Sequence, residues 1–112
     1  MIIQHKELAA GRWQRLSFVE QMAHIGSEVD RAIIWRQKNN NKYSQLAFER
    51  ALELLDLTIS TVHKYSSLKE LLRVREILVD YFLFDNQYQS NDKDWQDYFF
   101  AFGYAARLQS TC

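Results

Sequence analysis

Proline is absent from this chain of 112 residues, and glycine occurs only three times, at Gly11, Gly26 and Gly103. A sheet protein of this length needs glycine, proline or similar turn residues about every ten positions. This chain has almost no glycine or proline, so we do not expect a β-sandwich or a β-barrel. The absences favour long helices with short connections.

The chain also has only one cysteine and no net charge. The single cysteine, Cys112, is the last residue, so the sequence offers neither an internal disulfide framework nor a cysteine metal site. The 14 basic and 14 acidic residues cancel, leaving no net field to attract nucleic acid or an anionic membrane. Nucleic acid is therefore not an expected partner, and an RNA-binding module would need a basic face that the composition does not predict.

Long apolar runs are missing as well. No stretch approaches the roughly 20 apolar residues of a membrane span. The first residues, Met1 to Glu7, lack the cationic start and apolar core of a signal peptide. We therefore expect a cytoplasmic protein that does not enter a membrane.

The most regular stretch of the chain is 46–59, an uninterrupted run of good helix formers. Its main apolar stripe recurs at three- and four-residue steps and comprises Phe48, Ala51, Leu52, Leu55, Ile59 and Val62. Leu46 and Leu57 fall on the opposite side, and Glu49, Glu53 and Asp56 form an acidic row beside the stripe. This pattern predicts a helix that is buried on two sides.

The same periodicity predicts four helices, over 17–38, 43–63, 68–85 and 93–108. Ser17 with Glu20 and Ser67 with Glu70 have the spacing of capping boxes, and Asn91 or Asp92 can cap the last helix. Asn39 to Asn41 predict a loop, and Asn86 can close the third helix in a left-handed conformation. We therefore predict one all-α domain over 1–112, an antiparallel four-helix bundle with residues 1–16 as a leader packed on it.

Arg75 lies on the helical wheel at the centre of the third helix's apolar face, between Leu71, Leu72, Leu78 and Val79. A buried guanidinium needs carboxylate partners, and Asp56, Glu49 or Glu28 can supply them from facing helices. Two interpretations stay open. Arg75 either has a structural role, as a buried ion pair or as an arginine that extends its guanidinium to water at a bundle end, or it lines an interhelical pocket for an anionic ligand.

A second polar row lies on the first helix, where His24, Glu28, Arg31 and Trp35 follow at spacings of four, three and four. Such a row forms either a wall of the same ligand pocket or a solvated edge or subunit interface. The inward carboxylates raise the possibility of a di-iron site, but that chemistry requires Glu-x-x-His twice, and this spacing does not occur. We expect no metal site.

The sequence also lacks the common catalytic patterns. No serine lies in a glycine-flanked turn, the three glycines are isolated, and no arginine has the spacing to histidine that helical-bundle RNases of the HEPN type show. We therefore predict no cofactor and no catalytic residues.

Large apolar residues lie outside the main stripes on three of the predicted helices: Leu46, Leu57, Ile77, Phe84, Phe100 and Tyr104. One exposed apolar side chain is ordinary, but six suggest a second buried surface. A homo-oligomer with helices packed across a two-fold axis would bury them. Alternatively, the N-terminal leader covers some of them.

Segments Ser27–Ala32, Phe48–Asp56 and Tyr98–Arg107 resemble a family of small, uncharacterised all-helical bacterial proteins, over most of residues 12–108. The resemblance implies a compact bundle of bacterial type and no established activity. In architecture the chain is also similar to the four-helix-bundle proteins encoded in ribosomal RNA intervening sequences and to HEPN-type partners of nucleotidyltransferases. Fold does not fix function.

The leading hypothesis from the sequence is a non-enzymatic helical-bundle protein that self-associates and binds a partner, another protein. The alternative is a site around Arg75, with Glu28, Glu49 or Asp56 and walls of His24, Arg31 and Trp35. Such a site would bind or process an anionic small molecule or a nucleotide.

Overall fold

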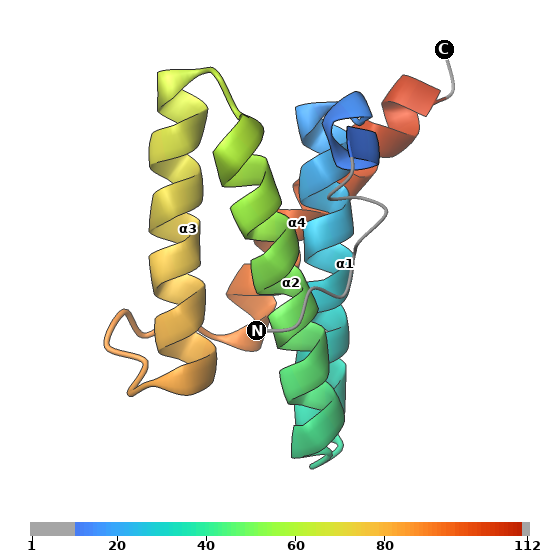
Figure 1. Ribbon diagram of the computed structural model, residues 1–112. Coiled ribbons are helices and arrows are strands. Elements are labelled where there is room, and N and C mark those ends of the chain that lie inside the picture. Colours follow the sequence, from blue (N-terminus) through green and yellow to red (C-terminus); the bar gives the residue numbers. More distant parts are fainter. Residues whose placement is uncertain (1–10, 111–112) are drawn as a thin grey trace.

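The computed structural model describes residues 11–110, which form a short 3-10 helix and four α-helices (Figure 1). In chain order these are η2 (Trp13–Arg15), α1 (Phe18–Gln37), α2 (Asn41–Thr61), α3 (Tyr65–Leu83) and α4 (Asp92–Ser110). The described part of the chain contains no strand, and the predicted all-α fold class is confirmed. None of the helices within it combines the length and hydropathy of a transmembrane span.

Side-chain caps fix where three of the helices begin. The Ser17 hydroxyl accepts from the Glu20 N–H at 3.1 Å, while the Glu20 carboxylate accepts from the Ser17 N–H at 2.9 Å, so the predicted capping box is confirmed. The Asn40 side chain accepts from the Tyr43 N–H, which starts α2 two residues earlier than predicted. The Asn91 side chain caps α4 through the Asp94 N–H, at 2.8 Å.

The second predicted capping box, at Ser67 and Glu70, is wrong. A capping residue must have non-helical backbone angles, whereas Ser67 already lies inside α3, which begins at Tyr65. Lys64 precedes the helix without a side-chain cap. At its other end α3 finishes at Leu83, and Asn86 takes the predicted left-handed conformation with φ of 53°.

Neighbouring helices run antiparallel, as predicted. α1 packs along both α2 and α4, whereas α3 approaches α2 less closely (Figure 1). α4 crosses obliquely behind the other helices. The antiparallel register follows from contacts whose residue numbers rise on one helix and fall on the other: Ser44–Ala32 and Arg50–Glu28, Phe48–Phe82 and Asp56–Arg75, Ser17–Gln109 and Gln96–Asp30.

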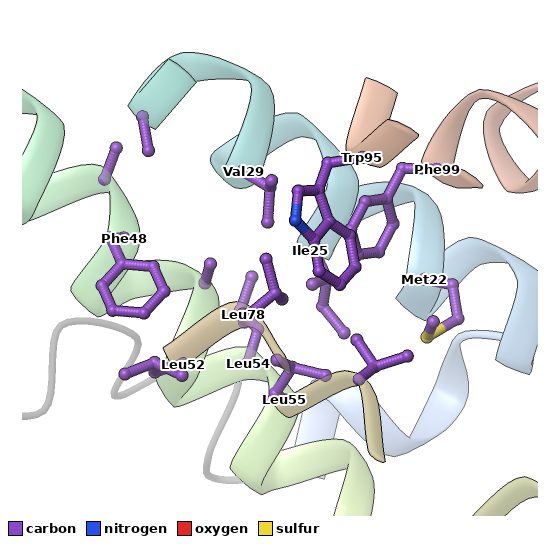
Figure 2. Close-up of a cluster of buried hydrophobic side chains, with 14 of the residues drawn as sticks. Met22, Ile25, Val29, Phe48, Leu52, Leu54, Leu55, Leu78, Trp95 and Phe99 are labelled. Atoms are coloured by element: carbon purple, nitrogen blue, oxygen red, sulfur yellow. The ribbon is translucent and has the colours of Figure 1, made fainter. Parts of the chain in front are cut away.

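A single apolar core fills the space between the helices (Figure 2). Figure 2 shows side chains from all four helices meeting there, including Ile25, Leu55, Leu78 and Phe99. Because apolar burial contributes about 25 cal/mol per Å² removed from water, this cluster is the main source of stability.

The described part of the predicted leader packs on the bundle through Trp13. Its indole is buried and donates from Nε1 to the Thr58 hydroxyl on α2 at 2.9 Å. The Gln21 side chain on α1 in turn donates to the Trp13 carbonyl at 2.9 Å. Trp13 therefore joins the leader to both α1 and α2. The remainder of the predicted leader, residues 1–10, lies outside the described residues, as does Cys112.

The closest approach between α1 and α4 occurs at Gly26. A Cβ atom on Gly26 would lie 2.6 Å from the Cβ of Phe99 and 2.9 Å from its Cγ, well inside van der Waals contact. The near end of the Phe99 side chain cannot move away without shifting α4 itself. Gly26 therefore sets the distance between the two helices.

We expect Gly26→Ala to lower the free energy of unfolding by about 1–3 kcal/mol, the usual cost of overpacking a core. Gly103 provides a matched control, since it also lies on the helical interface but its Cβ position meets nothing closer than an Arg107 guanidinium nitrogen at 3.9 Å. Gly103→Ala should stabilise the protein by up to about 1 kcal/mol through helix propensity. Urea unfolding measures both, and equal effects of the two substitutions would contradict this account.

Candidate functional site

Arg75 forms an ion pair, but a solvent-exposed one. Its Nε donates to Asp56 Oδ1 at 2.8 Å, with the two side chains 38% and 50% exposed. The predicted burial of this guanidinium is therefore wrong. The physical reason is that α3 buries only Leu71, Val74 and Leu78, and Arg75 lies at the edge of that narrow strip, facing Asp56 of α2.

Glu28 does not pair with Arg75. Its carboxylate is buried and accepts from Arg31 at 2.5 Å and from Arg50 Nε at 2.8 Å. Two charge-assisted hydrogen bonds offset the desolvation of this carboxylate and hold α2 against α1. Glu28 thus has a structural partner on each side.

The other residues of the predicted pocket wall also have separate neighbours. The His24 ring faces Trp13 with centroids 5.8 Å apart, and Trp35 meets Tyr43 edge-on at 5.0 Å. Glu49 accepts from Gln45 on its own helix at 3.4 Å. Of the residues predicted to line one anion site, the structure brings together Arg75 with Asp56 and Arg31 with Glu28, in two different places. Residues 11–110 contain no group of three or more His, Cys, Asp and Glu side chains placed to hold a metal ion.

Asp92 is a junction that the sequence indicated only as a helix cap. Its carboxylate accepts from Gln37 Nε2 at 3.0 Å, from Arg36 at 3.4 Å and from the Tyr81 hydroxyl, so it joins the ends of α1 and α3 to the start of α4. The Arg36 guanidinium also lies 4.5 Å from the ring centroids of both Tyr81 and Phe82. The sequence signal was weak, because Arg36 and Asp92 lie far apart along the chain.

This junction shifts the acidity of its members. Partial burial and the hydrogen bond to Asp92 raise the pKa of Tyr81 to about 12. Partial burial acts to raise the pKa of Asp92, but the hydrogen bonds from Tyr81 and Gln37 and the charge of Arg36 outweigh it and lower that pKa below its ordinary 3.8. The carboxylate therefore stays ionised at neutral pH and binds all three helices.

A mostly apolar pocket of about 340 Å³ separates α3 from α4 and includes Ile77 and Trp95 in its lining. Tyr98 bridges the two helices beside it by donating to the Glu70 carboxylate at 2.5 Å. Burial and this hydrogen bond raise the pKa of Tyr98, so its hydroxyl remains a donor at neutral pH. The buried Trp95 Nε1 has no hydrogen-bond partner within the described part of the chain.

The six predicted interface residues divide into two groups. Leu57 and Ile77 are partly buried and pack against the core, whereas Leu46, Phe84, Phe100 and Tyr104 are exposed. Phe84 is 70% exposed at the end of α3, beside a shallow hollow of about 580 Å³ formed with the α3–α4 connection. Leu46 lies on a different helix, α2, so these four do not form one continuous row.

The longest exposed apolar row lies on α4. Phe100, Tyr104 and Leu108, here called the α4 outer face, are 64%, 53% and 52% exposed and follow at four-residue steps. The Phe100 and Tyr104 rings stack with centroids 6.5 Å apart. Leu108 was not singled out in the sequence, although its spacing from Tyr104 is the signal that could have indicated it.

A groove of about 350 Å³ runs beside this face, between α4 and α1. Small residues of α1, Ala23, Gly26 and Ser27, form part of one wall, and Phe100 and Gly103 line the α4 side. Two charged residues also line the groove: Asp30 on α1 and Arg107 on α4. The α4 outer face and this groove adjoin each other and together form a candidate binding surface.

Comparison with known proteins gives no match: no protein-family model, no curated protein and no solved structure is similar enough to this chain. The resemblance to small helical bacterial proteins therefore stays a prediction, and function has to be argued from the surface described above.

The Asp92 junction predicts a pH dependence. Because its pKa is lower in the folded chain than its ordinary value, Asp92 contributes stability above pH 3.8 that is lost as the pH falls through the lower, folded-state pKa. Asp92→Asn should cost about 1 kcal/mol at pH 7, and the difference from the wild type should shrink below pH 3.8. Melting temperatures from pH 2.5 to 7 measure this, with Asp85→Asn, in the exposed α3–α4 connection, as control. A difference that stays constant over this range would contradict the assignment.

The exposure of the Arg75–Asp56 pair predicts a small effect of breaking it. Arg75→Met should change the free energy of unfolding by less than about 1 kcal/mol, as for other surface ion pairs. Urea unfolding measures it, and Arg50→Met, which leaves the buried Glu28 with one partner fewer, is the comparison expected to cost more. A loss of several kcal/mol in Arg75→Met would restore the buried-pair interpretation.

Proposed function

We propose that this chain is a non-enzymatic helical-bundle protein that acts by self-association and by binding a protein partner, with the α4 outer face as its contact surface. The single observation that carries the proposal is the exposed row of Phe100, Tyr104 and Leu108. Contiguous exposed apolar surface of this kind marks interaction sites more often than isolated residues do.

The chemistry of the row supports a protein contact. Aromatic side chains are enriched at protein interfaces, where they supply large rigid contact area at a low cost in conformational entropy. The Phe100 and Tyr104 rings lie stacked side by side and present one continuous aromatic surface. The adjoining groove adds concave surface into which a partner's side chains can pack.

The polar clusters support a structural role better than a catalytic one. Glu28, Asp56 and Asp92 each accept hydrogen bonds from cationic side chains, and in every case a neighbouring helix supplies one of the donors. Carboxylates used in this way hold helices together. The alternative of an anion-binding site around Arg75 has less support, because Asp56 pairs with this guanidinium and Glu28 lies with Arg50 instead.

Further parts of the proposal rest on the sequence. The absence of net charge favours a protein partner over nucleic acid. The resemblance of segments such as Phe48–Asp56 to small bacterial helical proteins supports a bacterial origin, and the composition supports a cytoplasmic location.

Wild-type protein should behave as a dimer or larger species in size-exclusion chromatography with light scattering. Phe100→Glu should shift it to monomer, because a carboxylate cannot be buried at an apolar contact without losing its hydration. The matched control is Phe84→Glu, which places the same charge at a similarly exposed phenylalanine directly after α3. A wild-type monomer at high concentration, or equal effects of the two substitutions, would contradict the proposal.

A further inference from the structure

The charges beside the α4 outer face are distributed unevenly along the helix. Gln96 and Arg107 both line the groove shared with α1, so they lie on the same flank of α4. They are separated by about three helical turns, or roughly 16 Å along the axis. The Gln96 amide donates to Asp30 Oδ1 on α1 at 3.1 Å. One end of the flank is therefore acidic, through Asp30, and the other is basic, through Arg107.

This arrangement is self-complementary under one particular symmetry. When two identical helices pack antiparallel about a two-fold axis lying in their interface, the direction along the helix reverses but each flank meets the same flank of the partner. An axis passing between Phe100 and Ala101 would bring the Arg107 end of one copy to the Asp30 end of the other. The dimer would then contain the Arg107–Asp30 pair twice, once on each side of the axis.

The same axis gives a consistent register to the outward side chains of α4. Residues Lys93, Asp97, Phe100, Tyr104 and Leu108 recur at three- and four-residue steps, which is the spacing of a helix-packing seam. With the axis between Phe100 and Ala101, the two Phe100 rings lie near the centre. Tyr104 then faces the partner's Asp97, so a phenol hydroxyl meets a carboxylate acceptor at the edge of the apolar contact.

A parallel arrangement lacks these features. Parallel packing about a two-fold axis along the helices exchanges the flanks, and it leaves Arg107 about three helical turns from the level of the partner's Gln96 and Asp30, so the Arg107–Asp30 pair cannot form. Antiparallel packing also places the positive end of each helix dipole beside the negative end of the other, which is electrostatically favourable.

We propose that a second copy of this chain occupies the α4 outer face, with the two α4 helices antiparallel about an axis between Phe100 and Ala101. In this dimer the Arg107 guanidinium of each copy pairs with Asp30 of the other beside the α1–α4 groove. The inference rests on the proposed self-association and specifies its symmetry, its register and the residues that select the orientation.

The test uses two single variants. Each weakens its own homodimer, but a heterodimer of the two contains two attractive charge pairs. In Asp30→Arg homodimers an arginine faces Arg107 twice, and in Arg107→Asp homodimers an aspartate faces Asp30 twice. Each variant alone should raise the dimer dissociation constant at least about tenfold, since repelling charges suppress wrong pairings. Mixing the two variants should restore near-wild-type affinity, because the heterodimer contains one Asp30–Arg107 pair and one reversed pair. Analytical ultracentrifugation with one variant fluorescently labelled measures both steps.

The control mixture combines Arg107→Asp with Glu76→Arg, which introduces the same cation at an exposed position on α3. This pair should show no preference for the heterodimer. Salt should weaken the preference in the test mixture, because dissolved ions screen the attraction between charges at a solvent-accessible contact. Circular dichroism of each variant confirms that it remains helical.

A cysteine placed at the axis tests the register without altering charge. In a Cys112→Ser background, Ala101→Cys should form an intermolecular disulfide under mild oxidation, whereas Ser66→Cys on α3 should not. If the wild type is dimeric but the charge variants do not rescue each other and Ala101→Cys does not cross-link, the register is overturned while self-association stands. A monomeric wild type overturns both.

Discussion

The close contact between Gly26 of α1 and Phe99 of α4 is the constraint on which the rest of this structure depends. With no side chain at Gly26, α4 lies near enough for Phe99 and Trp95 to enter the core beside α1. That orientation turns the adjacent residue, Phe100, outward. The buried face of α4 and its exposed apolar row therefore have one cause. A larger residue at Gly26 would disturb the core and the candidate interface together.

Features that depend on a few consecutive residues could be predicted from the sequence. The Ser17–Glu20 capping box and the Asn91 cap each involve atoms within one helical turn, and the structure contains both. Ser67 and Glu70 have equally good spacing, yet the box fails because α3 begins at Tyr65, before Ser67. Local spacing shows that a cap is chemically possible, whereas the neighbouring connection decides which residue begins the helix.

Features that depend on where neighbouring helices lie could not be predicted. The helical periodicity predicts that Arg75 lies at the centre of the apolar face of α3. Only part of that face contacts the core, so the Arg75 side chain is exposed to solvent. Leu57 and Ile77 pack against the core although the wheel placed them outside, because a helix contacts more than one neighbour. The Asp92 junction was missed for a related reason. Its partners come from two other helices, α1 and α3, whose proximity to α4 is a property of the whole bundle.

The way α3 is attached has a consequence for how the protein opens. α3 approaches the rest of the bundle less closely than the other helices do, and its contacts Arg75–Asp56, Tyr98–Glu70 and Tyr81–Asp92 each use a carboxylate. Segments with fewer buried contacts exchange with open forms at lower free energy than the core does. We therefore expect α3 to open at a lower free energy than α1, α2 and α4, although Leu71, Val74 and Leu78 anchor it in the shared core.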